Sequence, residues 1–244
     1  MTDIEVKALP RPFRQRAFAL LAVLGALCAS TAVLANDRPF QFARTAILED
    51  DDDQTWSFES WVQRYGSVRG VSIEPEYNFG AGRSVQVELG RFVDRNGEQT
   101  GQEGEVEFKQ LFNYIGSDGW AWGVSAAAGV ERTQAEGTVR HLNVKLPVSI
   151  ALGAHGYLHL NPGLALTSGS RRAFNQSAAI EKRLFERTMA FAEFAREREL
   201  RFGQIGARYW LKREKLALDF ALQQQRIEGR RSSGFILGLG AYDF

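Results

Sequence analysis

The chain has 244 residues and a formal net charge of +1 at neutral pH. A charge this close to zero gives no electrostatic reason to expect nucleic acid as a partner. Cys28 is the single cysteine, so an intramolecular disulfide is excluded and the fold must depend on burial and backbone pairing.

Residues 1–35 have the three-part pattern of a secretory signal peptide. Basic residues around Arg14 precede an apolar run from Ala17 to Leu34, and small residues close that run. A retained membrane helix is the alternative, because a run of about 18 apolar residues approaches the minimum for spanning a bilayer. We expect cleavage after Ala35, which leaves a mature chain of about 200 residues, enough for one domain.

Residues 36–53 form a polar lead-in that ends in an acidic stretch from Glu49 to Asp53. We expect a solvated periplasmic segment, since a run of like charges is usually exposed to water. A site that gathers divalent cations, or one that closes a pore from below, is the alternative. The segment is too short to form a folded plug domain.

From residue 54 to residue 244, apolar and polar residues alternate in many successive runs. In one of them Leu142, Val144 and Leu146 alternate with His141 and Asn143. Period-two alternation predicts strands with one apolar and one polar face. The runs also match the roughly 9–11 residues that a tilted strand needs to cross a bilayer.

The connections between these runs form two alternating sets, as expected for an up-and-down meander. The rhythm predicts strands at 54–65, 68–79, 83–93, 104–114, 119–132, 138–150, 156–166, 173–183, 188–195, 201–211, 216–226 and 233–244. An even strand number returns the chain to the side where it started. We therefore predict an all-β fold, a closed antiparallel transmembrane β-barrel of about twelve strands over residues 54–244.

Two features of the sequence oppose this prediction. Residues 177–201 are rich in Ala, Glu, Lys and Arg, which favour helix. One helix there would leave ten strands. Pro75, Pro147 and Pro162 fall inside predicted strands, where each removes a backbone donor, so we expect bulges or poorly paired positions.

Aromatic residues near the predicted strand ends support a membrane wall, because transmembrane barrels carry aromatic girdles at both interfaces. They are Trp56, Tyr77, Tyr114, Trp120, Trp122, Tyr157, Tyr209 and Tyr242.

The last residues of the chain, Tyr242 and Phe244, resemble the C-terminal signature of Gram-negative outer-membrane β-barrel proteins. The resemblance implies localisation in the outer membrane, and it implies that the barrel-assembly machinery recognises this strand. Phe235 and Leu237 occupy the opposite phase of the alternation. A bulge near Gly240 would restore the phase.

A narrower resemblance is carried by RPF at 38–40, by the ARYWL and LALDFAL strings within 207–222, and by the terminal Phe. These strings are similar to those of outer-membrane transporter barrels that include the phenol-degradation-associated family. The resemblance implies passage of small molecules through the barrel.

Beyond the predicted signal peptide, the nucleophile inventory offers no site for chemistry. The histidines are His141, His155 and His159, and Ser149 shares a strand face with His141. The two are about 26 Å apart along the strand, too far for a hydrogen bond between nucleophile and base. No compact Ser/His/acid grouping is expected, so we predict no catalytic residue, no metal site and no cofactor.

The polar strand face carries charges that would point into a barrel lumen. The predicted pore-lining residues are Glu59, Glu74, Glu76, Glu88, Glu107, Lys109, Lys145, Arg208 and Asp219. Opposing acidic and basic walls would order polar solutes as in porins. Alternatively the charges pair with each other and plug a narrow interior.

Basic residues in the predicted outer loops suggest a second role. Arg171, Arg172, Arg230 and Arg231 could contact the phosphates of lipopolysaccharide. The preferred function is passage of small polar or moderately hydrophobic solutes of unknown identity. A closed binding barrel that contacts lipopolysaccharide or a partner is the alternative, and a lipid-modifying enzyme is less favoured.

Overall fold

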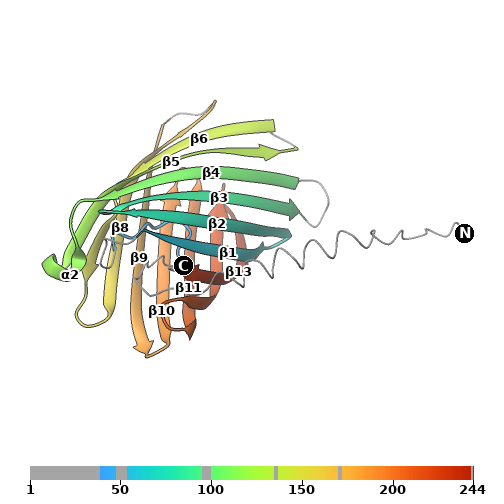
Figure 1. Cartoon of the computed structure of the whole chain (residues 1–244). Helices are drawn as coiled ribbons and strands as arrows, with labels where there is room; N and C mark the ends of the chain where they lie inside the picture. Colours follow the sequence, from blue (N-terminus) through green and yellow to red (C-terminus); the bar gives the residue numbers. More distant parts are fainter. Residues whose placement is uncertain (1–38, 48–53, 95–99, 135–136, 170–171, 243) are drawn as a thin grey trace, which may run out of the picture. The chain divides into compact units, whose positions relative to one another are not determined.

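The computed structural model describes residues 39–47, 54–94, 100–134, 137–169, 172–242 and 244. In this part of the chain, antiparallel strands form a closed barrel with twelve strand positions (Figure 1). The barrel closes where β1 (Thr55–Tyr65) pairs with β13 (Arg230–Tyr242), with Trp61 opposite Gly238. The expected up-and-down transmembrane barrel topology is therefore confirmed.

The other strands follow in chain order, each antiparallel to its neighbours. They are β2 (Val68–Gly80), β3 (Arg83–Asp94), β4 (Thr100–Leu111), β5 (Trp120–Thr133), β6 (Gly137–Lys145), β7 (Val148–Ala151), β8 (Gly156–Thr167), β9 (Ala173–Phe185), β10 (Thr188–Glu197), β11 (Leu200–Lys212) and β12 (Leu216–Ile227). Residues 177–201 therefore lie in three strands and the two turns between them, and the helical alternative for this segment is wrong.

The short helix α2 (Ile115–Asp118) lies in the connection between β4 and β5 and ends at Gly119, whose φ of 73° suits glycine. Among the described residues, no helix is long and apolar enough to cross a membrane.

Strands β6 and β7 together occupy one position in the wall, between β5 and β8. Pro147 separates them, and two backbone hydrogen bonds bridge the break, from Leu146 N to Pro162 O and from Gly123 N to Pro147 O. The expected interruption thus occurs at Pro147. Pro75 pairs with Phe58 of β1 but is skipped in the pairing with β3, and Pro162 pairs with Gln176 of β9 but with no residue of β6 or β7, so both positions are paired on one side only, as expected. The register shifts of the wall occur elsewhere.

The two faces of the wall have opposite character. Large apolar side chains on the outward face are about half exposed, among them Val62, Leu89, Val106, Phe220 and Leu237. The inward face carries buried carboxylate, amide, hydroxyl and guanidinium groups. A continuous apolar exterior around a polar interior is the pattern of a barrel whose outer surface contacts lipid.

Five of the eight aromatic residues named above are exposed, as expected for an interfacial girdle, and Tyr77 is partly buried on the outward face. The exposed residues are Trp56, Tyr114, Trp120, Trp122 and Tyr209. Tyr157 and Tyr242 differ, because both occupy inward positions, where Tyr157 stacks on His159 and Tyr242 is buried.

In the last strand, β13, Tyr242 lies on the inward face together with glycines, and Phe235 and Leu237 lie on the outward face. Pairing of β13 is continuous from Gly234 to Tyr242, so the expected bulge near Gly240 is absent from the described strand. Gly238 and Gly240 face inward, where a Cβ would collide with the rings of Trp61 and Tyr242 respectively. These glycines make room for lumenal aromatic side chains.

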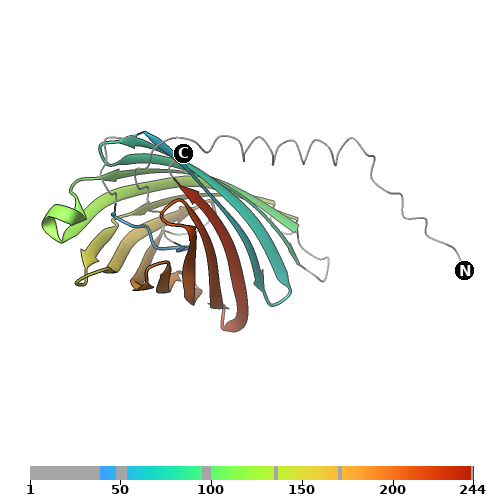
Figure 2. The same cartoon turned by 60° about the horizontal axis from the view of Figure 1, so that its bottom comes forward.

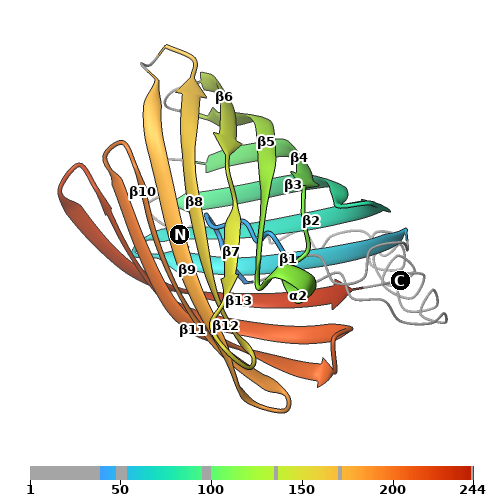
Figure 3. The ribbon, with the colours of Figure 1, turned by 90° about the vertical axis from the view of Figure 1, so that its left-hand side faces the viewer.

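Residues 39–47 lie inside the ring of strands (blue in Figures 2 and 3). We call them the lumenal strap. They belong to the segment that we assigned to the periplasm from sequence, and Ala43, Ala46 and Ile47 are almost completely buried. The predicted signal peptide, its cleavage after Ala35, and the acidic stretch from Glu49 to Asp53 lie outside the described residues.

Candidate functional site in the barrel lumen

The main attachment of the lumenal strap is the carboxylate of Glu193, which projects inward from β10. Its Oε1 accepts hydrogen bonds from the backbone N–H of Phe42 at 2.7 Å and of Ala43 at 2.6 Å. Its Oε2 accepts one from Gln41 N at 3.0 Å. Successive N–H groups that converge on one anion form a favourable binding concavity, so the strap binds a carboxylate of its own barrel. Gln204 Nε2 donates to the same carboxylate at 2.7 Å.

Barrel side chains also bind the carbonyl groups of the strap. The Phe42 carbonyl accepts hydrogen bonds from Lys145 Nζ at 2.6 Å and from Ser177 Oγ at 3.0 Å. Gln204 Nε2 also donates to the Pro39 carbonyl at 3.1 Å. The buried backbone of the strap thus finds polar partners on several strands, as buried peptide groups must.

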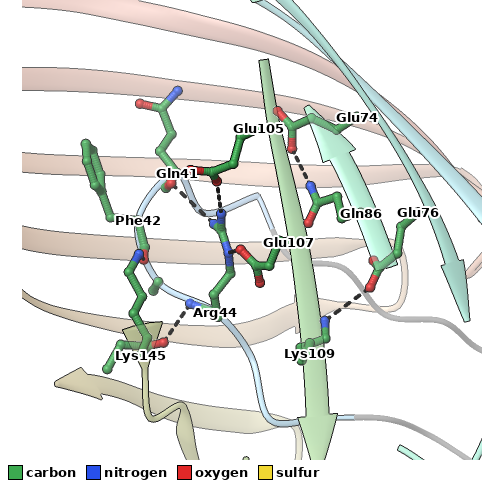
Figure 4. A network of polar contacts seen from close by, with 12 residues as sticks. Gln41, Phe42, Arg44, Glu74, Glu76, Gln86, Glu105, Glu107, Lys109 and Lys145 are labelled. Carbon is green, nitrogen blue, oxygen red and sulfur yellow. Dashed lines mark hydrogen bonds and ion pairs between the residues drawn. The ribbon is translucent and has the colours of Figure 1, made fainter. Parts of the chain in front are cut away.

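Arg44 connects the strap to the acidic side of the lumen (Figure 4). Its Nε donates to Glu107 at 2.6 Å, and its terminal nitrogen lies 3.9 Å from a carboxylate oxygen of Glu105. Its backbone N–H donates to Asn161 at 2.9 Å. Burial alone would lower the pKa of Arg44. The carboxylates of Glu107 and Glu105 raise this pKa by more than burial lowers it, so the guanidinium stays charged.

All nine predicted pore-lining residues occupy inward positions of their strands. Six are buried, namely Glu59, Glu76, Glu107, Lys109, Arg208 and Asp219, and three are partly buried, namely Glu74, Glu88 and Lys145. They do not form two opposed walls, because several contacts join strands that are neighbours or that have one strand between them. Lys109 lies 3.4 Å from Glu76, for example, and Gln86 donates to Glu74 at 3.0 Å (Figure 4).

Arg208, Asp219, Glu59 and Tyr242 form the seam cluster, at the place where the first and last strands meet. The guanidinium donates two hydrogen bonds to Asp219, at 2.7 and 2.8 Å, and one to Glu59 at 3.0 Å. Tyr242 also donates to Glu59, and its ring centroid lies 5.0 Å from the Arg208 guanidinium. The arrangement joins β11, β12, β13 and β1 through one completely buried cation.

Ser149, His159 and Glu181 form a compact group, and the expectation that no Ser/His/acid grouping exists is wrong. Ser149 lies directly opposite His159 on the neighbouring strand, with Oγ 2.8 Å from Nδ1. His159 Nε2 lies 3.6 Å from Glu181 Oε1. The prediction failed because it compared Ser149 with His141 along one strand, whereas the hairpin brings His159 across.

The position of this group favours anchoring over catalysis. Ser149 and His159 are completely buried, and Ser149 Oγ accepts a hydrogen bond from the strap residue Ala46 at 2.8 Å. The ring of Phe40, also in the strap, packs 5.4 Å from the imidazole. A nucleophile must reach its substrate, and here the strap occupies that position.

The lumenal strap leaves little free space beside it. A cavity of about 20 Å³ remains among Phe40, Ala43, Arg44, Thr45, Glu59, Glu74, Gln86 and Lys109. This volume is close to that of one water molecule. Among these residues, the strap and the inward side chains therefore leave room for about one water molecule.

The sequence interpretation missed the residues that hold the strap. Glu193 and Gln204 occupy inward positions of β10 and β11, and the alternation AFAEFA gave a signal for Glu193 as one carboxylate on an otherwise apolar or small-residue face. No group of three or more His, Cys, Asp or Glu residues suited to a metal ion occurs in the described part of the chain.

The remaining predicted site residues are scattered. Arg171 is outside the described residues, Arg172 is exposed, and Arg230 and Arg231 begin β13. Tyr242 is an inward residue of the seam cluster. Strand β13 ends there, so Phe244 lies beyond the strand.

No family model matches this sequence, and no curated protein matches it. Solved structures with a similar fold include channels of the outer membrane. The KdgM porin, solved in complex with disordered oligogalacturonate, has a TM-score of 0.60 at 8% identity, over 76% of this chain and 98% of that chain. The NanC porin has a TM-score of 0.56 at 8% identity, over 78% of this chain and all of the porin.

An outer-membrane channel from Pseudomonas putida F1 has a TM-score of 0.56 at 8% identity, over 85% of this chain and all of that channel. At this level of identity the likeness concerns the fold alone. The fold is that of a porin-like outer-membrane β-barrel.

Proposed function

We propose that the protein is an outer-membrane channel for small polar or moderately hydrophobic solutes, and that the lumenal strap is its gate. The apolar exterior, the charged interior and the porin-like fold support a channel. The strap, which fills the lumen, supports a gated one.

The proposal of a gate is supported by the type of hydrogen bond that holds the strap. Among the described residues, the strap makes no backbone–backbone hydrogen bond with any strand. Its contacts are side-chain hydrogen bonds, ring contacts and the ion pairs of Arg44. Release of the strap would therefore expose the polar lumen to water without breaking the hydrogen-bonded wall.

The charge of the emptied lumen would favour cations. Inward carboxylates gather on β2, β3 and β4, and Arg44 is the strap's contribution to their neutralisation. Once Arg44 leaves, Glu88 and Glu107 face the aqueous path with few cations beside them. Rings of carboxylates select cations in this way in other pores.

A closed binding barrel is the second candidate, and the small residual cavity beside the strap favours it. In that case the strap would be a permanent part of the core, and the protein would act through its outer surface. Neither candidate needs a catalytic residue, so we also propose that the protein is not an enzyme.

Single-channel recording separates the two candidates. The mature chain and a variant that lacks residues 39–47 are refolded into planar bilayers, and heat-modifiable gel mobility confirms that each is folded. We expect brief, rare openings for the intact chain and steady conductance for the deletion variant. If both folded proteins are silent, the channel proposal is wrong.

A charge-neutral substitution tests the lumenal field separately. In the deletion variant, Glu88→Gln with Glu107→Gln should reduce the preference for potassium over chloride. Lys182→Gln, on the outward face of β9, is the control and should not change it. An unchanged preference in the double variant would exclude these carboxylates as the selective groups.

Two narrower proposals rest on sequence resemblance alone. One is a relation to the phenol-degradation-associated transporter barrels. The other is recognition of the last strand, with Tyr242 and Phe244, by the barrel-assembly machinery.

A further inference from the structure

Four arginines form a row across the outward face of four adjacent strands. Strand pairing places Arg196 opposite Arg201, Arg201 opposite Arg226, and Arg226 opposite Arg231. All four are exposed, and all four occupy outward positions. We call them the arginine row. It lies at the end of the barrel opposite to the start of β1 and the end of β13.

The arginine row is unfavourable without a counter-charge. Like charges directly opposite each other on paired strands destabilise a sheet. Within the described part of the chain, no ion pair or side-chain hydrogen bond joins any of these four guanidinium groups to another residue. Glu197, the residue after Arg196, occupies an inward position of β10, and Glu199 and Glu228 belong to the hairpin turns. The row therefore has the charge of a site for an external anion.

A hollow of about 760 Å³ adjoins the arginine row on the same strands. Arg201, Arg226 and Arg231 lie along it, and large apolar side chains line it further from the row, namely Phe194, Ile205 and Leu222. Each of these apolar residues is about half exposed or more. The hollow therefore joins a cationic end to an apolar end.

Gly203 keeps this hollow open. It occupies an outward position of β11, opposite Phe194 on one side and Gln224 on the other. A Cβ built there would meet only the Glu193 carbonyl oxygen, at 3.7 Å. The position could hold a larger side chain without collision, so glycine leaves space that a ligand could occupy.

A second hollow on the wall, of about 530 Å³, provides a contrast. It includes Arg91, Gln102 and Arg132, but its lining contains no large apolar residue. Basic side chains at this end of the barrel are thus not sufficient to make an amphiphilic site. The combination of guanidinium groups and an apolar floor belongs to the hollow beside the arginine row.

We propose that the arginine row and the adjoining hollow bind lipopolysaccharide of the outer leaflet, with lipid A phosphates on the guanidinium groups and an acyl chain along Phe194, Ile205 and Leu222. Guanidinium groups bind phosphate through paired, charge-assisted hydrogen bonds. Basic clusters at a membrane surface bind anionic head groups. An even-stranded barrel places both ends of the strand series in the periplasm, and the arginine row lies at the other end.

Native mass spectrometry of the full mature chain tests this site, with bis-phosphorylated lipid A added to the protein in detergent. We expect a one-to-one complex. Arg201→Gln with Arg226→Gln should lower the bound fraction at least about tenfold, because loss of a charge-assisted hydrogen bond typically weakens binding by that order. Lys182→Gln with Lys212→Gln removes the same charge at the opposite end and should leave binding unchanged.

Gly203→Leu tests the hollow without altering charge. The substitution should weaken the binding of lipid A. The affinity for inorganic phosphate, measured by its competition with lipid A, should not change. Equal binding of lipid A by the wild type and the double arginine variant would overturn the proposal. Equal binding of phosphatidylglycerol and lipid A would also overturn it, because the site would then recognise any anionic lipid. Heat-modifiable mobility confirms that each variant is folded.

Discussion

The seam cluster and the network around Arg44 are both buried in the lumen, but they differ in where their members are attached. The seam cluster of Arg208, Asp219, Glu59 and Tyr242 is built entirely from strands of the wall. The network around Arg44 joins strand carboxylates to the strap, which pairs with none of the strands in the described part of the chain. Both are buried and hydrogen-bonded, but only the second can separate while the barrel stays closed.

Under the proposed gating, this difference separates a structural role for the seam cluster from a gating role for the network around Arg44. If the strap leaves, water can enter the lumen and solvate Glu107, so the cost of an unpaired carboxylate is largely removed. No comparable exit exists for Arg208, whose side chain is completely buried against Trp210 and Tyr242. In the proposed channel, the same chemistry would therefore stabilise the wall at one site and close the lumen reversibly at the other.

The largest effect is expected from Arg208→Met. The substitution leaves Asp219 and Glu59 buried without their cation, which typically costs about 3–5 kcal/mol. The midpoint of urea unfolding, followed by tryptophan fluorescence in lipid vesicles, should fall accordingly. Arg213→Met, at a half-exposed turn position, is the control and should cost less than about 1 kcal/mol. Equal unfolding midpoints for the two variants would contradict a structural role for the seam cluster.

The sequence predicted the wall well because its signal is local. Alternation of period two is decided by each strand's own two faces, so the strand limits and the inward position of residues such as Glu59 and Arg208 could be derived. Residues 39–47 show no such alternation. Their position is decided by Glu193, about 150 residues further along the chain, and no local pattern reports that contact.

To predict contacts between strands, the pairing register must be known as well as the alternation of apolar and polar residues. Ser149 meets His159, and Arg226 meets Arg231, because each pair is symmetric about a tight hairpin turn. Glu228 and Gly229 both have positive φ, as in a two-residue hairpin turn, and knowledge of this turn would have placed the second pair. Lumenal pairing across the closure, as between Arg208 and Glu59, depends on the whole barrel and carries no such signal.

A smaller effect on stability, but a clear one on gating, is expected from Arg44→Met. The variant loses a charge-assisted hydrogen bond to Glu107, a contact that typically contributes about 1.5–3 kcal/mol. The open probability in planar bilayers should rise by about 10- to 100-fold, since each 1.4 kcal/mol is a factor of ten. The urea midpoint should change far less than in Arg208→Met. If the urea midpoint falls strongly and the open probability does not rise, Arg44 stabilises the barrel wall and does not hold the gate closed.

The smallest effect is expected from Ser149→Ala, which also decides the role of the Ser149–His159–Glu181 group. The substitution removes the acceptor for Ala46 N–H, a neutral hydrogen bond that contributes about 1 kcal/mol. Open probability should therefore rise only about fivefold. Thr at position 149 keeps the hydroxyl and is the matched control.

The two roles of this serine predict different results in an esterase assay with a short-chain ester. If Ser149 is an anchor, Ser149→Ala changes the open probability, and the rate of ester hydrolysis is at background level in both the wild type and the variant. A nucleophile predicts wild-type hydrolysis that Ser149→Ala abolishes and that deletion of residues 39–47 increases. In the wild type, the Ala46 N–H donates a hydrogen bond to the Ser149 hydroxyl. The bound strap is therefore compatible with an anchoring role of Ser149, whereas it would block a nucleophilic role.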